Sequence, residues 1–155
     1  MNINGKKAIV FGGTSGIGLS ATNMLSEKGA NVIAVSRNPE KLKDLPKNVT
    51  TKKLDITDKE TVEKFFQEVG EYDILVNSAT GGARAVGPFL SMDLDGFKAS
   101  FDKLWGYTNV VRYGTKFLKN DGNIVLVSGS PARKCRPGQI AISSVGGAVE
   151  AFARG

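Results

Sequence analysis

A glycine-rich segment, residues 10–18 with the sequence VFGGTSGIG, constrains this chain more than any other feature. An apolar run, residues 8–11, leads into the segment, and an amphipathic helical pattern, residues 17–28, follows it. The order strand, glycine-rich turn, helix is typical of proteins that bind a dinucleotide pyrophosphate, because glycine permits a tight turn and a close backbone approach. Free N–H groups and the dipole at the helix start then favour a phosphate. The spacing is GxxxGxG rather than GxGxxG, and a tight turn without a ligand is the alternative interpretation.

The rest of the chain alternates apolar runs with amphipathic segments. This alternation predicts parallel βαβ units with right-handed crossovers. We therefore expect an α/β fold, a doubly wound, Rossmann-like parallel sheet in three α/β/α layers, as a single domain over residues 1–155. Strands are expected at residues 7–11, 30–35, 49–54, 73–76 and 123–127, and helices at residues 17–28, 58–69, 93–104, 107–118 and from about 143. Thr57 and Glu60 have the spacing of a capping box at the second of these helices.

The composition narrows the class of function. The 155 residues carry a net charge of +6, and a phosphate-rich cofactor or an anionic substrate would explain this positive charge. The charge is scattered along the chain and only 8% of the residues are aromatic, which argues against nucleic-acid binding. One cysteine, Cys135, excludes an internal disulfide, and the absence of histidine argues against a metal site. No apolar run approaches the ~20 residues that span a membrane, and the amino terminus lacks a signal-peptide pattern. We expect a cytoplasmic protein.

The end of the second expected strand bears on the choice of cofactor. Ser36 and Arg37 stand there, where a dinucleotide-binding fold contacts the adenosine ribose. An acidic residue at this place holds a ribose 2′-hydroxyl, whereas an arginine accommodates a 2′-phosphate. The sequence therefore predicts NADP(H) in preference to NAD(H), and a solvated surface arginine is the alternative.

Five motifs, in the same order along the chain, resemble the short-chain dehydrogenase/reductase family. Gly12, Gly16 and Gly18 match the TGxxxGxG motif, with Phe11 in place of the usual threonine. The other motifs are Asp55-Ile56, residues 77–80, residues 124–128 and residues 148–152. Asp55-Ile56 resembles the family's adenine-contacting pair, and residues 77–80 resemble its NNAG stretch. Residues 124–128 resemble the strand before the catalytic serine, and residues 148–152 resemble the helix of the catalytic lysine. The resemblance implies cofactor contacts at Gly12, Thr14, Ser15, Gly16, Ile17, Gly18, Ser36, Arg37, Asp55, Ile56, Asn77, Ser78 and Ala79.

The resemblance breaks at the family's four catalytic positions. The family uses a tyrosine as general acid/base, a lysine four residues later that lowers the tyrosine pKa, a serine that orients the carbonyl and an asparagine that anchors a relay water. These positions fall on Ile142, Gly146, Gly129 and Lys103, respectively. General acid–base groups contribute typically ~10²–10⁴-fold each, so ordinary carbonyl reduction should be severely weakened. The candidate replacements are Ser128 and Ser130, which flank Gly129, and Lys103, as a cation or as an acid whose pKa is lowered by burial.

Four further cations follow the fourth and fifth expected strands: Arg84, Arg133, Lys134 and Arg136. Ligands of open α/β sheets lie beyond the carboxyl ends of the strands. These cations therefore predict a small-molecule substrate with a carboxylate or a phosphate. Solvated basic side chains are the alternative for all four, and a salt-bridged or solvated side chain is the alternative for Lys103.

Relative to the family, the sequence stops within its last expected helix, at residues 153–155. The resemblance implies two more strands and a substrate-covering segment, so we expect a sheet that is incomplete at this edge. An exposed hydrophobic edge favours pairing, and we expect a homo-oligomer through the edge and the last two helices. Two functions fit the motifs: an NADP(H)-dependent oxidoreductase that transfers hydride to or from a carbonyl/alcohol substrate with non-standard catalytic residues, or a non-catalytic dinucleotide-binding sensor, scaffold or subunit.

Overall fold

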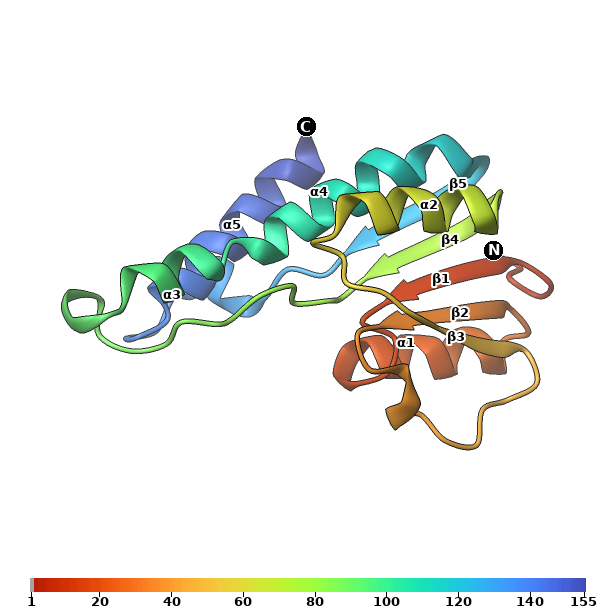
Figure 1. Cartoon of the computed structure of the whole chain (residues 1–155), viewed down its shortest axis with the longest axis horizontal. Coiled ribbons are helices and arrows are strands. Elements are labelled where there is room, and N and C mark those ends of the chain that lie inside the picture. The colour runs from red at the N-terminus through yellow and green to blue at the C-terminus, as the bar shows by residue number, and fades with distance from the viewer. Residues whose placement is uncertain (1) are drawn as a thin grey trace.

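Five parallel strands form the centre of the protein in the order β3-β2-β1-β4-β5. The computed structural model (Figure 1) describes residues 2–155. The strands are β1 (Lys7–Phe11), β2 (Asn31–Ser36), β3 (Val49–Lys53), β4 (Tyr72–Asn77) and β5 (Leu118–Leu126). From β1 the chain first adds β2 and β3 on one side and then crosses over to add β4 and β5 on the other, so the strand order reverses between β1 and β4. The carboxyl ends of parallel strands at such a switch point form a crevice for ligands. The predicted Rossmann-like α/β fold is confirmed.

Helices cover both faces of the sheet. α1 (Gly16–Glu27) lies on one face, whereas α2 (Lys59–Val69), α4 (Asp102–Gly114) and α5 (Ile140–Arg154) lie on the other (Figure 1). α3 (Leu94–Ala99) and the loop after β4 extend past the carboxyl ends of the strands, on the left of Figure 1. Across residues 2–155, no helix combines the length and the apolar character that crossing a membrane requires.

The central strand β1 contributes to both halves of the core. Its side chains alternate, with Ile9 and Phe11 packed among residues of α2 and α4 and with Ala8 and Val10 on the α1 side. A parallel strand buried on both faces accounts for the continuous apolar run before the glycines. The Phe11 ring meets Phe65 of α2 edge-on, with ring centroids 5.7 Å apart. The phenylalanine that replaces the family's threonine therefore fills the core beneath α2.

The edge strand β5 is irregular over its first half. Its pairing with β4 shifts register between Leu118, which lies opposite Tyr72, and Asn123, which lies opposite Ile74. Only the second half of β5 therefore forms the regular ladder, and this half matches the strand predicted at residues 123–127.

The bulged half of β5 contributes to an ionic cluster at the amino-terminal end of the sheet. The Asp73 side chain is 4% exposed and accepts hydrogen bonds from the Lys7 backbone N–H (2.9 Å), Lys6 Nζ (3.1 Å) and Lys119 Nζ (3.4 Å). Burial opposes ionisation, but these bonds outweigh it and hold the pKa of Asp73 below its usual value. Asp121, which also contacts Lys6 at 3.1 Å, extends the cluster into solvent. The cluster ties β1, β4 and β5 together at the end opposite the crevice.

The break between α3 and α4 lies at Ser100 rather than near Gly106, so the predicted helices over residues 93–104 and 107–118 are wrong at their junction. The Ser100 hydroxyl donates to the Gly96 carbonyl and accepts from the Ala85 N–H, both at 2.9 Å, and this ties the loop after β4 to the helix junction. Gly106 lies inside α4, where a Cβ would overlap the Ile56 side chain. Glycine at 106 therefore permits close packing and does not end a helix.

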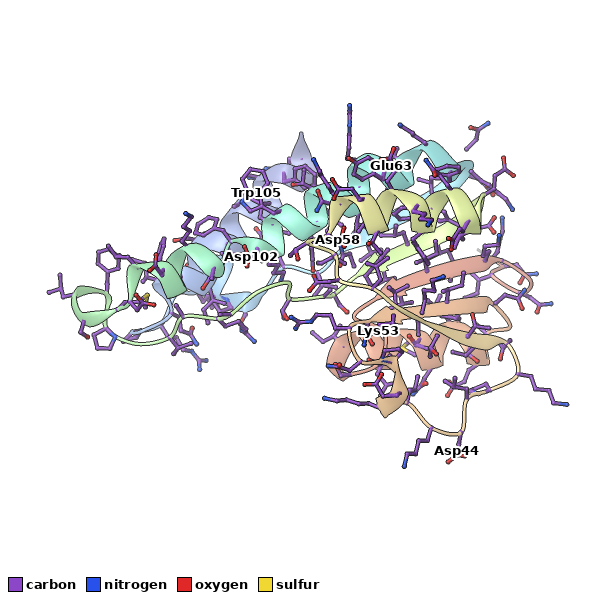
Figure 2. All side chains as sticks on the ribbon, in the orientation of Figure 1. Asp44, Lys53, Asp58, Glu63, Asp102 and Trp105 are labelled. Carbon is purple, nitrogen blue, oxygen red and sulfur yellow. The ribbon has the colours of Figure 1, made fainter. Side chains whose placement is uncertain are left out.

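The helix α2 is capped by Asp58 (Figure 2), so the prediction of a capping box beginning at Thr57 is wrong. An Asp58 carboxylate oxygen accepts from the Thr61 N–H at 3.0 Å. Thr57 instead donates its N–H and its hydroxyl to the Asp55 carboxylate, at 3.0 and 2.8 Å. The last helix, α5, also begins earlier than predicted, at Ile140 rather than near residue 143.

Candidate dinucleotide site and adjoining cavity

The glycine-rich turn packs tightly against the end of β4. Gly12 has a φ of +76°, and a Cβ there would come within 2.8 Å of the Ala79 nitrogen. A Cβ on Gly18 would overlap the Gly12 carbonyl oxygen and the Ser78 hydroxyl. That hydroxyl donates to the Phe11 carbonyl at 3.0 Å, which joins the ends of β1 and β4. Two of the three motif glycines are therefore required by packing and backbone conformation.

The amino terminus of α1 has no partner from its own side chains. Its N-cap residue, Ser15, makes no side-chain capping hydrogen bond, and the first turn carries no acidic residue. Gly16 has a φ of +50°, and a Cβ there would meet nothing within 4 Å. The unpaired N–H groups and the dipole of this helix end attract an anion. The turn thus offers a phosphate an uncovered helix terminus.

A first cavity of about 460 Å³ lies over this helix terminus. All the predicted cofactor residues line it except Asn77: Gly12, Thr14, Ser15, Gly16, Ile17, Gly18, Ser36, Arg37, Asp55, Ile56, Ser78 and Ala79. Asn77 is buried behind the wall, where its side-chain oxygen accepts from the Ala79 N–H at 3.3 Å. Sequence reasoning missed Lys41, although its charge and its place four residues after Arg37 were available as a signal.

The end of the first cavity beside β2 carries cations and a hydroxyl without a hydrogen-bond partner. The exposed Arg37 donates from Nη1 to the Gly81 carbonyl at 3.0 Å, and so reaches from the end of β2 to the loop after β4. The Ser36 hydroxyl is buried and has no hydrogen-bond partner among residues 2–155. A buried hydroxyl without a partner costs free energy unless a ligand or water satisfies it. The open helix terminus, the unpaired hydroxyl and the cations match the phosphate and ribose groups of a dinucleotide.

A second cavity of about 310 Å³ adjoins the first, and Ile17, Ser78, Thr80 and Arg84 line both. The four positions that the family resemblance assigns to catalysis, at Lys103, Gly129, Ile142 and Gly146, all line this second cavity. Ile142 and Gly146 stand one turn apart on α5, where they contribute an apolar side chain and a bare backbone. Ser128 and Ser130 also line this cavity. The Ser128 hydroxyl donates to the Gly146 carbonyl at 3.1 Å.

Lys103 is a partly buried cation on α4. Burial, and secondarily the charge of Arg84, lower the pKa of Lys103 from its ordinary value. Its Nζ lies 5.3 Å from the centre of the Tyr107 ring, one helical turn later. The Tyr107 hydroxyl lies 2.7 Å from the Asn77 carbonyl and 2.9 Å from the Val127 carbonyl, so its proton is shared between the ends of β4 and β5. Burial raises the pKa of Tyr107, which keeps the phenol protonated.

The basic loop before α5 lies outside the walls of both cavities. Arg133 pairs with Glu150 of α5 at 3.2 Å, and Lys134 and Arg136 are exposed. Their proposed substrate contact stays a prediction, whereas Arg84 lines both cavities. The part of the chain that the structure describes holds no group of three or more potential metal ligands.

The switch-point crevice and the glycine-rich turn define the class, an α/β protein of dinucleotide-binding architecture. A sequence model described as short chain dehydrogenase matches residues 6–155, and the chain belongs to this family.

Similar proteins include oxidoreductases with different substrates. The chain is 32% identical over 153 residues to 3-oxoacyl-(acyl-carrier-protein) reductase FabG of Thermotoga maritima, a match that covers 90% of this chain and 61% of that protein. It is 31% identical over 156 residues to carbonyl reductase (NADPH) 2 of Sus scrofa, with 96% and 63% covered. The chain thus spans under two thirds of the length of these relatives.

Solved structures match over nearly the whole chain. A short chain dehydrogenase from Burkholderia cenocepacia in complex with NADP has a TM-score of 0.89 and 28% identity, with 99% of this chain and 66% of that chain covered. A small-chain dehydrogenase in complex with NADPH has a TM-score of 0.79 and 27% identity, with 96% and 62% covered. These complexes support a nicotinamide dinucleotide as the cofactor class.

Proposed function

We propose that the chain binds NADP(H) in the first cavity. The observation that carries the proposal is the uncapped amino terminus of α1, which opens into a cavity walled by the glycine-rich turn. The N–H groups of this terminus would hold the pyrophosphate. The unpaired Ser36 hydroxyl and the Asp55 carboxylate would meet the adenosine half.

The preference for NADP(H) over NAD(H) is assigned to Arg37 and Lys41. Both line the adenosine end of the cavity, and together they offer two positive charges to a 2′-phosphate. Arg37 donates one hydrogen bond, from Nη1, to the Gly81 carbonyl, so its other N–H donors remain for the phosphate. The NADP and NADPH complexes of similar structures support a nicotinamide dinucleotide as the cofactor class.

We further propose that the second cavity holds a carbonyl or alcohol substrate for hydride transfer. A bound nicotinamide supplies or accepts the hydride. Lys103 holds a proton on Nζ at this cavity, and its lowered pKa makes that proton easier to release than that of an ordinary lysine. The exposed Ser130 hydroxyl orients the substrate oxygen, and the Ser128 hydroxyl, which donates to the Gly146 carbonyl, holds α5 against the end of β5 beside it.

The second candidate function is a non-catalytic dinucleotide-binding sensor, scaffold or subunit. The observation that favours it is the pair Ile142 and Gly146, because neither residue carries a proton to transfer or a charge. Under this proposal the cofactor site is retained, and the second cavity does no chemistry.

A homo-oligomer is also part of the proposal. Trp105 of α4 is 63% exposed and points away from the sheet (Figure 2). An exposed tryptophan on a helix is a common anchor of a protein interface. Sedimentation equilibrium of the chain and of Trp105→Ala tests this, and a monomer at all concentrations would contradict it.

Calorimetric titration with NADPH and NADH is the experiment for cofactor binding. Charge-assisted hydrogen bonds are worth ~1.5–3 kcal/mol, so NADPH should bind at least about tenfold more tightly than NADH. The variant Arg37→Gln should lose most of this difference, whereas the matched control Arg112→Gln, at an exposed site on α4, should keep it. Failure of both cofactors to bind would sink the proposal. With NADPH bound, single-turnover reduction of a carbonyl panel by the native chain and by Lys103→Gln separates the two functions.

A further inference from the structure

The charges around the second cavity are all of one sign. Its walls contain two cations, Arg84 and Lys103, together with five hydroxyl side chains and no acidic residue. We propose that this cavity binds the carboxylate of a small oxo acid between Arg84 and Lys103. The inference rests on the proposed function in one respect, since it names the substrate class of the same site.

Neither cation has a counterion from the chain. Among residues 2–155, all the ion pairs within 4.0 Å join other residues, and no side-chain hydrogen bond engages Arg84 or Lys103. The Tyr107 ring, 5.3 Å from Lys103 Nζ, supplies no negative charge. A partly buried cation without a counterion is costly, and a second cation nearby adds repulsion. The lowered pKa of Lys103 reports both effects. An anion placed between the two side chains would remove the repulsion and compensate for the burial of Lys103.

The backbone holds these two residues near one another. The loop after β4 packs on the start of α4, so closely that a Cβ on Gly81 would come 2.7 Å from the Asp102 carbonyl oxygen. The Ala85 N–H donates to the Ser100 hydroxyl at 2.9 Å, which fixes the loop directly after Arg84. Arg84 therefore lies in a segment anchored on both sides to the helix junction that carries Lys103. This arrangement sets the pair before any ligand arrives.

The rest of the wall defines what the anion is attached to. Ile17, Val127, Ile142 and Val145 give the cavity an apolar side, and its volume of about 310 Å³ admits a small molecule. A guanidinium takes a carboxylate through two parallel hydrogen bonds. The Ser130 hydroxyl remains for a neighbouring carbonyl, whereas the Ser128 hydroxyl already donates its proton to the Gly146 carbonyl. An acid with a short apolar chain and an oxo group matches these three features together.

Binding by isothermal calorimetry tests the proposal without relying on turnover. Pyruvate, 2-oxobutyrate and 4-oxopentanoate are each titrated against the matching neutral amide, with and without saturating NADP⁺. At least one acid should bind about tenfold more tightly than its amide, since a charge-assisted contact is lost in the amide. Arg84→Gln and Lys103→Gln should each weaken that acid about tenfold. The exposed controls Arg112→Gln and Lys64→Gln should leave it unchanged, and circular dichroism checks that all variants fold.

The outcomes separate this inference from the cofactor assignment. If no acid exceeds its amide, or if the controls weaken binding as much as Arg84→Gln and Lys103→Gln, the inference is overturned. If Arg84→Gln weakens NADP⁺ and leaves the acids unaffected, Arg84 belongs to the cofactor site and the inference also fails. If an acid discriminates as expected while neither NADP⁺ nor NADPH binds, the carboxylate site stands and the proposed function falls.

Discussion

The substitution Gly18→Ala tests the packing of the glycine-rich turn most directly. The new methyl group would overlap the Gly12 carbonyl oxygen and the Ser78 hydroxyl, and it would lie 2.6 Å from the Gly12 carbonyl carbon. Two of these atoms belong to the backbone of the turn, so a side-chain rotation does not relieve the overlap. α1 must move away from the ends of β1 and β4, and the open helix terminus moves with it.

The magnitude follows from two opposing effects. Overpacking a close contact costs ~1–3 kcal/mol, and alanine in a helix gains ~0.5–1 kcal/mol over glycine. We expect a net loss of about 1–2 kcal/mol in the free energy of unfolding. At ~2–4 °C per kcal/mol for a domain of this size, the melting temperature falls by roughly 2–8 °C. The affinity for NADPH should fall more than about tenfold, because the N–H groups of α1 leave their positions.

Two other glycines calibrate the experiment. Gly147 in α5 meets nothing within 4 Å, so Gly147→Ala should raise stability by ~0.5–1 kcal/mol and leave NADPH binding unchanged. Gly16 also has open space, but its φ of +50° costs an alanine ~1–2 kcal/mol. Thermal unfolding and calorimetric titration of the three variants give the comparison. A Gly18→Ala protein as stable as Gly147→Ala, with native affinity, would refute the packing argument.

Three more predictions concern the sheet ends and the second cavity. Asp73→Asn should lower the free energy of unfolding by ~1–3 kcal/mol in urea at pH 7. Because the folded pKa of Asp73 is depressed, its contribution is present above the unfolded pKa near 4 and disappears as pH falls through the folded pKa. The stability of the variant should therefore fall less steeply with acid than that of the native chain, and an equal slope would contradict this. Tyr107→Phe should cost ~1–2 kcal/mol by leaving two strand-end carbonyls without their donor, and unchanged urea unfolding would exclude that role. Ile142→Tyr with Gly146→Lys should raise the rate of carbonyl reduction by NADPH ~10²–10⁴-fold. The gain should require Ala132→Gly as well, because a Cβ at 146 comes 2.8 Å from the Ala132 methyl. Equal rates with and without Ala132→Gly would disprove the clash.

Local sequence rules succeeded where a residue acts on its immediate neighbours. The strand, turn and helix around Gly12 and Gly16 depend on backbone conformation, which the sequence reveals directly. The same holds for Ser36 and Arg37, because the residue after a parallel strand has one place to go, the carboxyl edge of the sheet. These features were predictable because their causes lie within a few residues.

The failures have causes that lie far away in the sequence. Gly106 has the appearance of a helix breaker, and only its contact with Ile56 reveals why glycine is needed there. Thr57 and Asp58 are both good N-cap residues, and the choice between them is made by Asp55, which occupies Thr57. In each case a tertiary contact decided between options that local propensity left equal.

The position of the cation in the second cavity links these observations to chemistry. The family resemblance predicts a lysine at position 146 on α5, where the chain has glycine, and an asparagine at position 103 on α4, where it has lysine. Both positions line the same cavity, so the positive charge is kept but is supplied by a different helix. Tyrosine is missing from position 142, so a cation at 146 would have no phenol to activate. In the proposed carboxylate site, a cation at 103 beside Arg84 has a different use, which is to hold an anion in the same cavity. The substitutions at 103, 142 and 146 are therefore consistent with one another, and they favour a redesigned site over a set of independent losses.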